Sequence, residues 1–330
     1  MNRGDAKTWL RWLIGLAVLV VLAIVFRNSL GFLGEAVRAL RTAAPLPVVF
    51  AVVAAAVSMI AMAQVMNLLM RAANVPTTLR DCNDLTLAAN SWSTTMPGGP
   101  AFAAVLALQV QRQWGATVAV GAWYFMLSGA LSTLWMVLMG LLAVVFMGAD
   151  LSVWSLLGSL AGVAITVWAL YWATAHPQTL RRWALAMKLP EKVGEQLDSL
   201  SQVSMDPRTY LAAAGHSLAN KLLDVVMLWC AVWSVTGALP ALHAGTNETT
   251  VMGVTLAFLS AKIAGSAQVT PAGVGVVEGA TVGALVATGM TVTHATAATI
   301  IYRLVSFILV AAYGWVIYFA RFARDGFSSR

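Results

Sequence analysis

Five ionisable side chains lie inside apolar stretches of the sequence, and they are the residues best placed to do chemistry. They are Lys221, Asp224, Lys262, Glu278 and Arg303. An ionisable group in a membrane span costs about 2.5–3.5 kcal/mol on insertion scales, which makes it a functional candidate by default. No paired carboxylates, His/Cys metal cluster, Walker loop or nucleophile elbow accompanies them. The set therefore favours binding or transport of a charged group, with no catalytic residue, no metal and no cofactor.

Glu278 follows a break in an apolar helix and falls in the first turn of the next half-helix. A half-helix N-terminus carries unpaired N–H groups that favour a phosphate headgroup or a carboxylate. Glu278 either satisfies its own helix end or pairs with Arg303 or Lys262, or it titrates during transport. The residues that form this break are Pro271, Gly273 and Gly275.

Lys221 and Asp224 are three residues apart and therefore share one face of a helix. A structural ion pair between them is the favoured interpretation. His216 and Asn220 fall on the same face, which predicts a polar strip directed toward the protein interior.

The first break in the chain precedes these residues and is uncharged, at Met96-Pro97-Gly98-Gly99-Pro100, so the break beside Glu278 is the second. Pro100 cannot continue a helix from Gly98, so the interruption is firm. Side chains before it can satisfy freed backbone groups or contact a headgroup, and Arg112 at the end of the segment could meet lipid phosphate. These side chains are Asn90, Ser91, Ser93, Thr94 and Thr95.

Glycines recur at four-residue spacing after the second break, at positions 275, 279 and 283. Such a flat stripe lets another helix approach closely, so close helix packing is expected here.

The composition requires that membrane-spanning helices position these residues. The chain is 60% hydrophobic and 10% charged, with a mean hydropathy of +0.80, whereas soluble domains are about 25% charged. It is predicted to be an all-α polytopic membrane protein, with residues 1–330 forming one integral membrane domain. Lys and Arg mostly flank the apolar spans, so the net charge of +7 indicates contacts with anionic lipid and no nucleic acid.

A span needs about 20 apolar residues, which predicts six spans and two interrupted regions. The pieces beside the first break, of about 11–13 residues, are too short to cross the hydrocarbon, so they are expected to form a re-entrant hairpin. The second region is either re-entrant or a pair of true spans. The predicted spans are 10–28, 48–70, 116–147, 152–174, 209–236 and 294–320, and the interrupted regions are 85–112 and 251–290.

The distribution of Lys and Arg places both termini on the cytoplasmic side of the cell membrane, although Arg27, Arg38 and Arg41 fall on the opposite side. The first hairpin then enters from the cytoplasm and the second from outside, which predicts an inverted-topology repeat. Its halves are 10–147, broken at 96–100, and 152–320, broken at 270–279, joined by a cytoplasmic interfacial segment at 176–208.

Both breaks and their flanks resemble the lysylphosphatidylglycerol synthase transmembrane (flippase-like) family. The motifs are Asn90 to Phe102 with Gln111-Arg112-Gln113-Trp114-Gly115, and Pro271 to Gly279 with Tyr302-Arg303-Leu304. The resemblance covers about residues 10–320 and implies an inner-membrane protein that moves a lipid between leaflets. Many relatives carry an Arg-containing motif after the first break, where this chain has Trp123-Tyr124-Phe125. The soluble synthase domain of the best-known members is missing, so lipid aminoacylation is not expected.

The leading hypothesis is a flippase for an anionic or glycosylated lipid, including a polyprenyl-phosphate lipid, and it allows an oligomer. One alternative is a non-transporting accessory subunit of an envelope-biosynthesis enzyme such as a glycosyltransferase. A weaker alternative is a proton-coupled transporter of a small anion.

Overall fold

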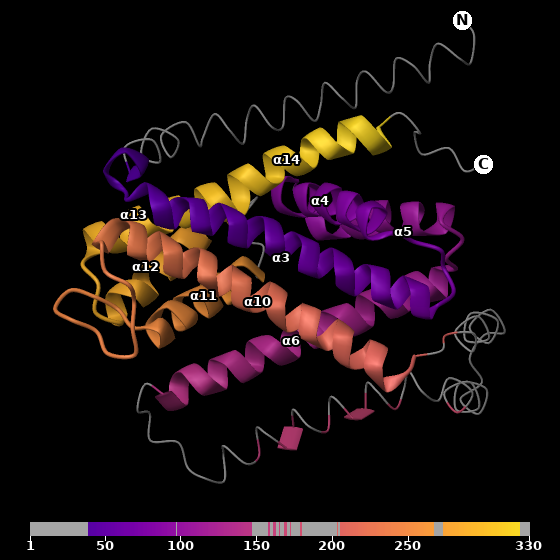
Figure 1. Cartoon of the computed structure of the whole chain (residues 1–330), viewed down its shortest axis with the longest axis horizontal. Coiled ribbons are helices and arrows are strands. Elements are labelled where there is room, and N and C mark those ends of the chain that lie inside the picture. The colour runs from indigo at the N-terminus through magenta and orange to yellow at the C-terminus, as the bar shows by residue number, and fades with distance from the viewer. Residues whose placement is uncertain are drawn as a thin grey trace, which may run out of the picture.

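Figure 1 shows the computed structural model of the chain, which describes residues 39–96, 98–146, 203, 205–266 and 273–323, and isolated positions between 158 and 179. Helices and their connections account for these residues, with no strand among them. The predicted span 10–28, most of 152–174 and nearly all of the segment 176–208 lie outside the described residues, as do Pro97 and Pro271.

Four helices among the described residues are long and apolar enough to cross a membrane. They agree with the predicted spans 48–70, 116–147, 209–236 and 294–320. The last of them is built from two α-helices and two π-helical segments. The spans are α3 (Pro45–Ala72), α6 (Val118–Phe146), α10 (Pro207–Thr236), and the continuous run of α13 (Val292–Arg303), η2 (Leu304–Leu309), α14 (Val310–Ile317) and η3 (Tyr318–Phe322).

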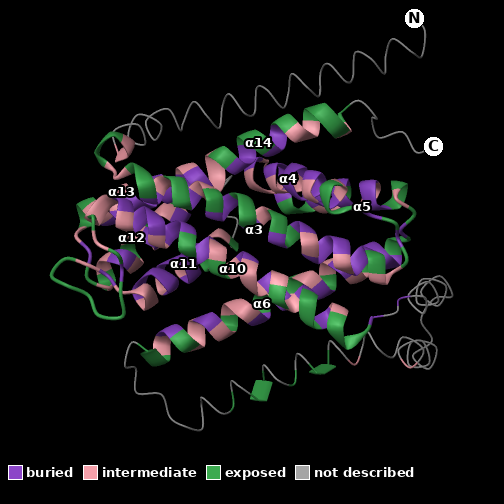
Figure 2. Ribbon diagram, in the orientation of Figure 1, coloured by how far each residue is buried: buried purple, intermediate pink, exposed green. Residues whose placement is uncertain are grey.

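These helices carry large apolar residues that are exposed, and Figure 2 shows exposed positions along the surface of the bundle. Phe50 on α3 is 47% exposed and Met126 on α6 is 73% exposed. In water such an apolar surface would be unfavourable, whereas lipid tails solvate it at no cost. The chain is therefore a multi-pass membrane protein.

The sequence marks both ends of α10. The Asp206 side chain accepts a hydrogen bond from the Thr209 N–H, and Pro207 occupies the first helical position, where it needs no donor. Hydrogen bonding with the Thr209 side chain, supplemented by backbone N–H groups, lowers the pKa of Asp206. At the other end, Gly237 adopts the left-handed conformation with φ 73° that stops the helix.

The first interrupted region is a helical hairpin of α4 (Leu79–Thr95) and α5 (Gly99–Gln113). Its arms have 17 and 15 residues, longer than the predicted 11–13 but still only about 22–26 Å at 1.5 Å per residue. Gly98 turns the chain with φ 66°. A Cβ on Gly99 would overlap the carbonyl oxygens of Trp92 and Ser93, so only glycine fits where the arms meet.

The second interrupted region is also a pair of short helices, α11 (Val251–Ser266) and α12 (Val276–Ala287), packed against each other. They contain 16 and 12 residues, and each is shorter than the roughly 20 residues that a span needs.

The packing of the hairpins interlocks the two halves of the chain. Helix α3 packs along α10, α4 packs against α14, and α11 packs against α6. Each hairpin therefore lies beside the span that follows the other hairpin. In Figure 1, α4 and α5 extend into the bundle from one end and α11 and α12 from the other.

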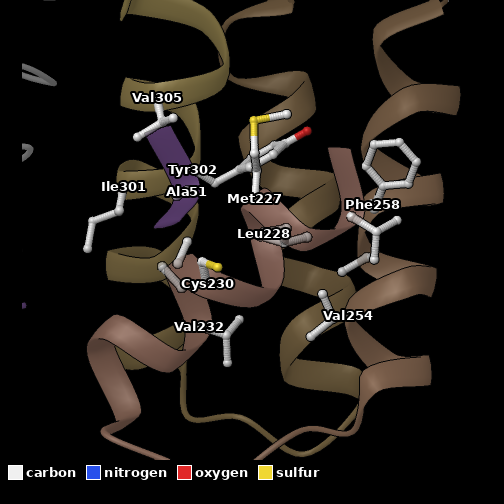
Figure 3. Close-up of a cluster of buried hydrophobic side chains, with 14 of the residues drawn as sticks. Ala51, Met227, Leu228, Cys230, Val232, Val254, Phe258, Ile301, Tyr302 and Val305 are labelled. Carbon is white, nitrogen blue, oxygen red and sulfur yellow. The ribbon is translucent and has the colours of Figure 1, made fainter. Parts of the chain in front are cut away.

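The apolar core consists of two clusters, one beside each hairpin. The first contains Leu85, Leu127 and Leu131 around α4–α6. The second, shown in Figure 3, joins residues such as Phe258 and Ile301 of α11 and α13 to α10.

Candidate functional site

A cavity of about 550 Å³ lies where the two hairpin breaks meet. Gly98 and Gly99 line it from the first break, and Ser266 and Gly273 line it from the second. Helices α3 and α10 and the α13–η2 junction complete the wall. The sequence predicted a charged group, Glu278, at the second break and no charge at the first, and the fold joins both breaks in a single cavity.

Glu278 and Arg303 form an ion pair at this cavity. The Arg303 Nε donates to Glu278 Oε1 at 2.6 Å. The other carboxylate oxygen, Oε2, accepts the Gly275 N–H at 2.6 Å and so caps α12. Two of the three roles considered for Glu278, capping its helix and pairing with a cation, therefore occur together, because its two oxygens face different donors.

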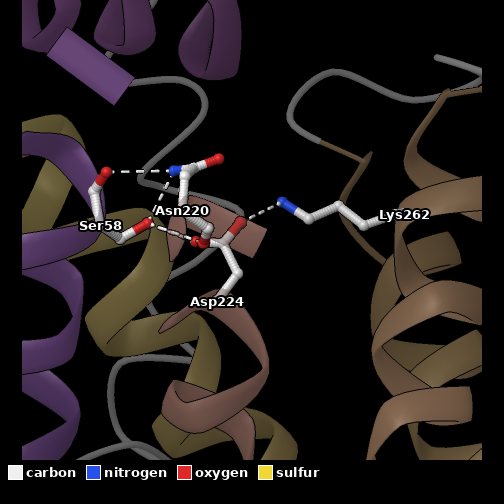
Figure 4. Close-up of polar contacts among 4 residues, drawn as sticks. All are labelled: Ser58, Asn220, Asp224 and Lys262. Carbon is white, nitrogen blue, oxygen red and sulfur yellow. Dashed lines mark hydrogen bonds and ion pairs between the residues drawn. The ribbon is translucent and has the colours of Figure 1, made fainter. Parts of the chain in front are cut away.

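Asp224 pairs with Lys262 of α11 at 3.3 Å, not with Lys221 as expected. The expectation was wrong because it considered only neighbours on one helix, whereas the tertiary packing brings α11 up to Asp224. Ser58 of α3 donates to the other oxygen of Asp224 at 2.7 Å, and Asn220 donates to Ser58 (Figure 4). The predicted polar strip on α10 is thus directed inward at Asn220 and Asp224, which are buried.

The two cations differ in their availability. The side chain of Lys262 is 40% exposed while that of its partner Asp224 is 8% exposed. Arg303 is 10% exposed, its guanidinium lies over the ring of Phe307, and it is held by Glu278. Lys262 is therefore the charged group that a ligand entering the cavity reaches most easily.

The first break contributes polar groups without charge. Asn90, Ser93 and Thr94 line the cavity beside it. The Thr94 and Thr95 hydroxyls donate to the carbonyls of Asn90 and Ser91, as expected for groups that satisfy the backbone near a break.

A π-helical segment, η2, begins immediately after Arg303 and carries two further lining residues, Ser306 and Phe307. Single π turns inside α-helices occur often at functional sites. No pattern in the sequence signals this segment. Ser58 was also missed, although it is a polar residue within the apolar span 48–70.

Several predicted residues lie away from the cavity. Arg112 is exposed at the end of α5, and Lys221 is half-buried on α10 without lining the cavity. The predicted packing of the glycine stripe is wrong for the described residues, because a Cβ at Gly275, Gly279 or Gly283 would meet none of their atoms within 4 Å.

Comparison with known proteins adds one finding. Residues 12–314 match the family model described as the lysylphosphatidylglycerol synthase TM region. No curated protein matches the chain. The matched range contains both hairpins and every residue named in the cavity.

Proposed function

Since the chain belongs to the lysylphosphatidylglycerol synthase transmembrane family, we propose that it moves a lipid with an anionic headgroup between membrane leaflets. The substrate class comprises phospholipids, glycosylated phospholipids and polyprenyl-phosphate lipids. The family itself indicates a membrane function related to lipids.

The observation that carries the proposal is the placement of Lys262 and Arg303 on one cavity between two helix breaks. A guanidinium and an ammonium bind phosphate through charge-assisted hydrogen bonds. Each is already balanced by a carboxylate, which lowers the cost of keeping it within the membrane. Broken helices at a central site are a recurrent feature of transporters.

We further propose that the halves form an inverted-topology repeat with two re-entrant hairpins. In its support, α3, α4, α5 and α6 correspond in order to α10, α11, α12 and the final span. In this correspondence the contact of α4 with α14 is the counterpart of the contact of α11 with α6. The contact between α3 and α10 lies at the centre of the repeat. Rocking of one half against the other would expose the shared cavity to each leaflet in turn.

The proposed reaction is transfer alone, with no catalytic step or cofactor. A role as an accessory subunit predicts that purified protein moves no lipid. A proton-coupled anion transporter predicts uptake of a soluble anion that depends on a pH gradient.

The test is lipid scrambling by purified protein in proteoliposomes that contain an acyl-labelled phosphatidylglycerol. Arg303→Met and Lys262→Met remove one charge-assisted contact each, worth about 1.5–3 kcal/mol, so each should slow transfer about 10- to 100-fold. The matched control is Arg80→Met, which removes an exposed cation outside the cavity. Normal transfer by both cavity variants, in folded and monodisperse protein, would overturn the mechanism.

A further inference from the structure

Asp224 is held in place by contacts that do not involve a cation. Its Oδ1 accepts from Ser58 at 2.7 Å, and Ser58 accepts from the Asn220 amide at 2.8 Å. These residues are buried at the α3–α10 contact (Figure 4). The second oxygen, Oδ2, faces Lys262 across 3.3 Å. When the ion pair opens, the lysine is therefore the partner that moves.

An anionic headgroup in the cavity competes with Asp224 for Lys262. Lys262 is the most exposed charged group of the two ion pairs, and its ammonium also lies 5.2 Å from the centre of the Phe258 ring. If its ammonium turned toward a phosphate, Asp224 would be left as a buried carboxylate without a cation. An unpaired buried charge is costly, and this cost would be subtracted from the affinity for the anion.

Lys221 is positioned to remove that cost. It lies on α10 three residues before Asp224, a spacing at which side chains on one helix face are neighbours. It is half-buried, and the charges of both Asp224 and Lys262 act on it. Within the part of the chain that the structure describes, Lys221 has no ion pair or hydrogen bond of its own.

We propose that Lys221 and Lys262 share Asp224, and that Lys221 becomes its partner when Lys262 binds the phosphate of a lipid headgroup. Lys221 is then a positioning residue that never touches the lipid and sets the affinity of the cavity for anions. The proposal rests on the proposed function, since it requires an anionic headgroup at Lys262.

The test measures the ratio of phosphatidylglycerol to phosphatidylcholine retained by the detergent-purified full chain from equimolar mixed micelles, by native mass spectrometry. Lys221→Met should lower this ratio roughly three- to tenfold, while Lys221→Arg, which keeps the charge, should retain it. In an Asp224→Asn background no carboxylate needs compensation, so adding Lys221→Met should have no further effect. This dependence on Asp224 separates positioning from a general loss of positive charge or of structure.

Two results would overturn the proposal: an unchanged ratio in Lys221→Met, or an equal loss in the Asp224→Asn background. Arg303→Met distinguishes these from failure of the proposed function. If Arg303→Met lowers the ratio and Lys221→Met does not, the cavity binds anions and only the exchange is wrong. If the unsubstituted protein shows no preference for phosphatidylglycerol, both the proposed function and the exchange fail.

Discussion

Glu278 performs two tasks with its two oxygens, and this explains why a carboxylate sits beside a site proposed for anions. One oxygen neutralises Arg303 and the other caps the first turn of α12. A guanidinium carries five N–H donors, of which the Nε–H of Arg303 is the one that donates to Glu278. The pair thus stabilises the break and keeps Arg303 oriented at the cavity wall.

These tasks can be separated by substitution. Glu278→Gln keeps an oxygen that can accept the Gly275 N–H but loses the charge, whereas Glu278→Ala loses both. Loss of a cap costs about 1 kcal/mol, so Glu278→Ala should unfold at a lower temperature than Glu278→Gln in detergent. Both should impair lipid transfer. Equal melting temperatures would contradict the capping role.

At the scale of the elements, hydrogen bonds and an ion pair connect the first hairpin to the last span. Ser91 donates to the Ala311 carbonyl, and Trp315 donates to Thr95. Gly314 permits this approach, since a Cβ there would overlap the Leu87 carbonyl. Arg321 adds an ion pair with Asp84 at 3.1 Å, near the open end of the hairpin.

The Asp84–Arg321 pair is asymmetric, which gives a prediction. The side chain of Asp84 is 10% exposed and that of Arg321 is 39% exposed. Removing the arginine therefore leaves a nearly buried carboxylate without a cation. Arg321→Met should therefore lower the melting temperature more than Asp84→Asn does. The double variant should recover most of the lost melting temperature, since it leaves no unpaired charge. Additive losses in the double variant would show that the pair is not coupled.

Sequence reasoning located both hairpins but not their arms in full. The turn at Gly98 and Gly99 was recognisable because proline and glycine have strong local effects. The arm α4 begins at Leu79, earlier than predicted, because polar residues such as Asp84 made its first half resemble a loop. Its pairing with Arg321 and its packing against α14 are tertiary contacts that propensity does not register.

For the whole molecule, basic side chains gather where α3 ends, α4 begins and α10 begins, with Arg71, Arg80 and Arg208. The opposite end contains the loop 237–250, which has no Lys or Arg. From the positive-inside rule we propose that the first of these ends faces the cytoplasm. Arg41 is exposed near the opposite end and departs from the rule.

Topology can be tested by labelling single cysteines in a variant whose buried Cys82 and Cys230 are replaced by serine. Gln113→Cys and Thr246→Cys place exposed thiols at opposite ends of the bundle. In intact cells an impermeant maleimide should label position 246 and spare position 113 until the membrane is permeabilised. Labelling of position 113 alone would reverse the assigned orientation.

The sequence by itself determined the class of protein, the four spans among the described residues, both breaks and the set of intramembrane charges. These features depend on local properties: hydrophobic length, backbone conformation and the cost of charge in lipid. It also named Arg303 and Lys262 as alternative partners of Glu278, and the structure selects Arg303.

Only the tertiary structure decided which charges meet and which surfaces are covered. Asp224 pairs with Lys262 instead of its helix neighbour Lys221, and the glycines at 279 and 283 have no described helix packed against them. Two breaks that are distant in the sequence line one cavity. Such pairings depend on how whole helices cross and interlock, and that geometry is set by the sum of many contacts, which no local pattern contains.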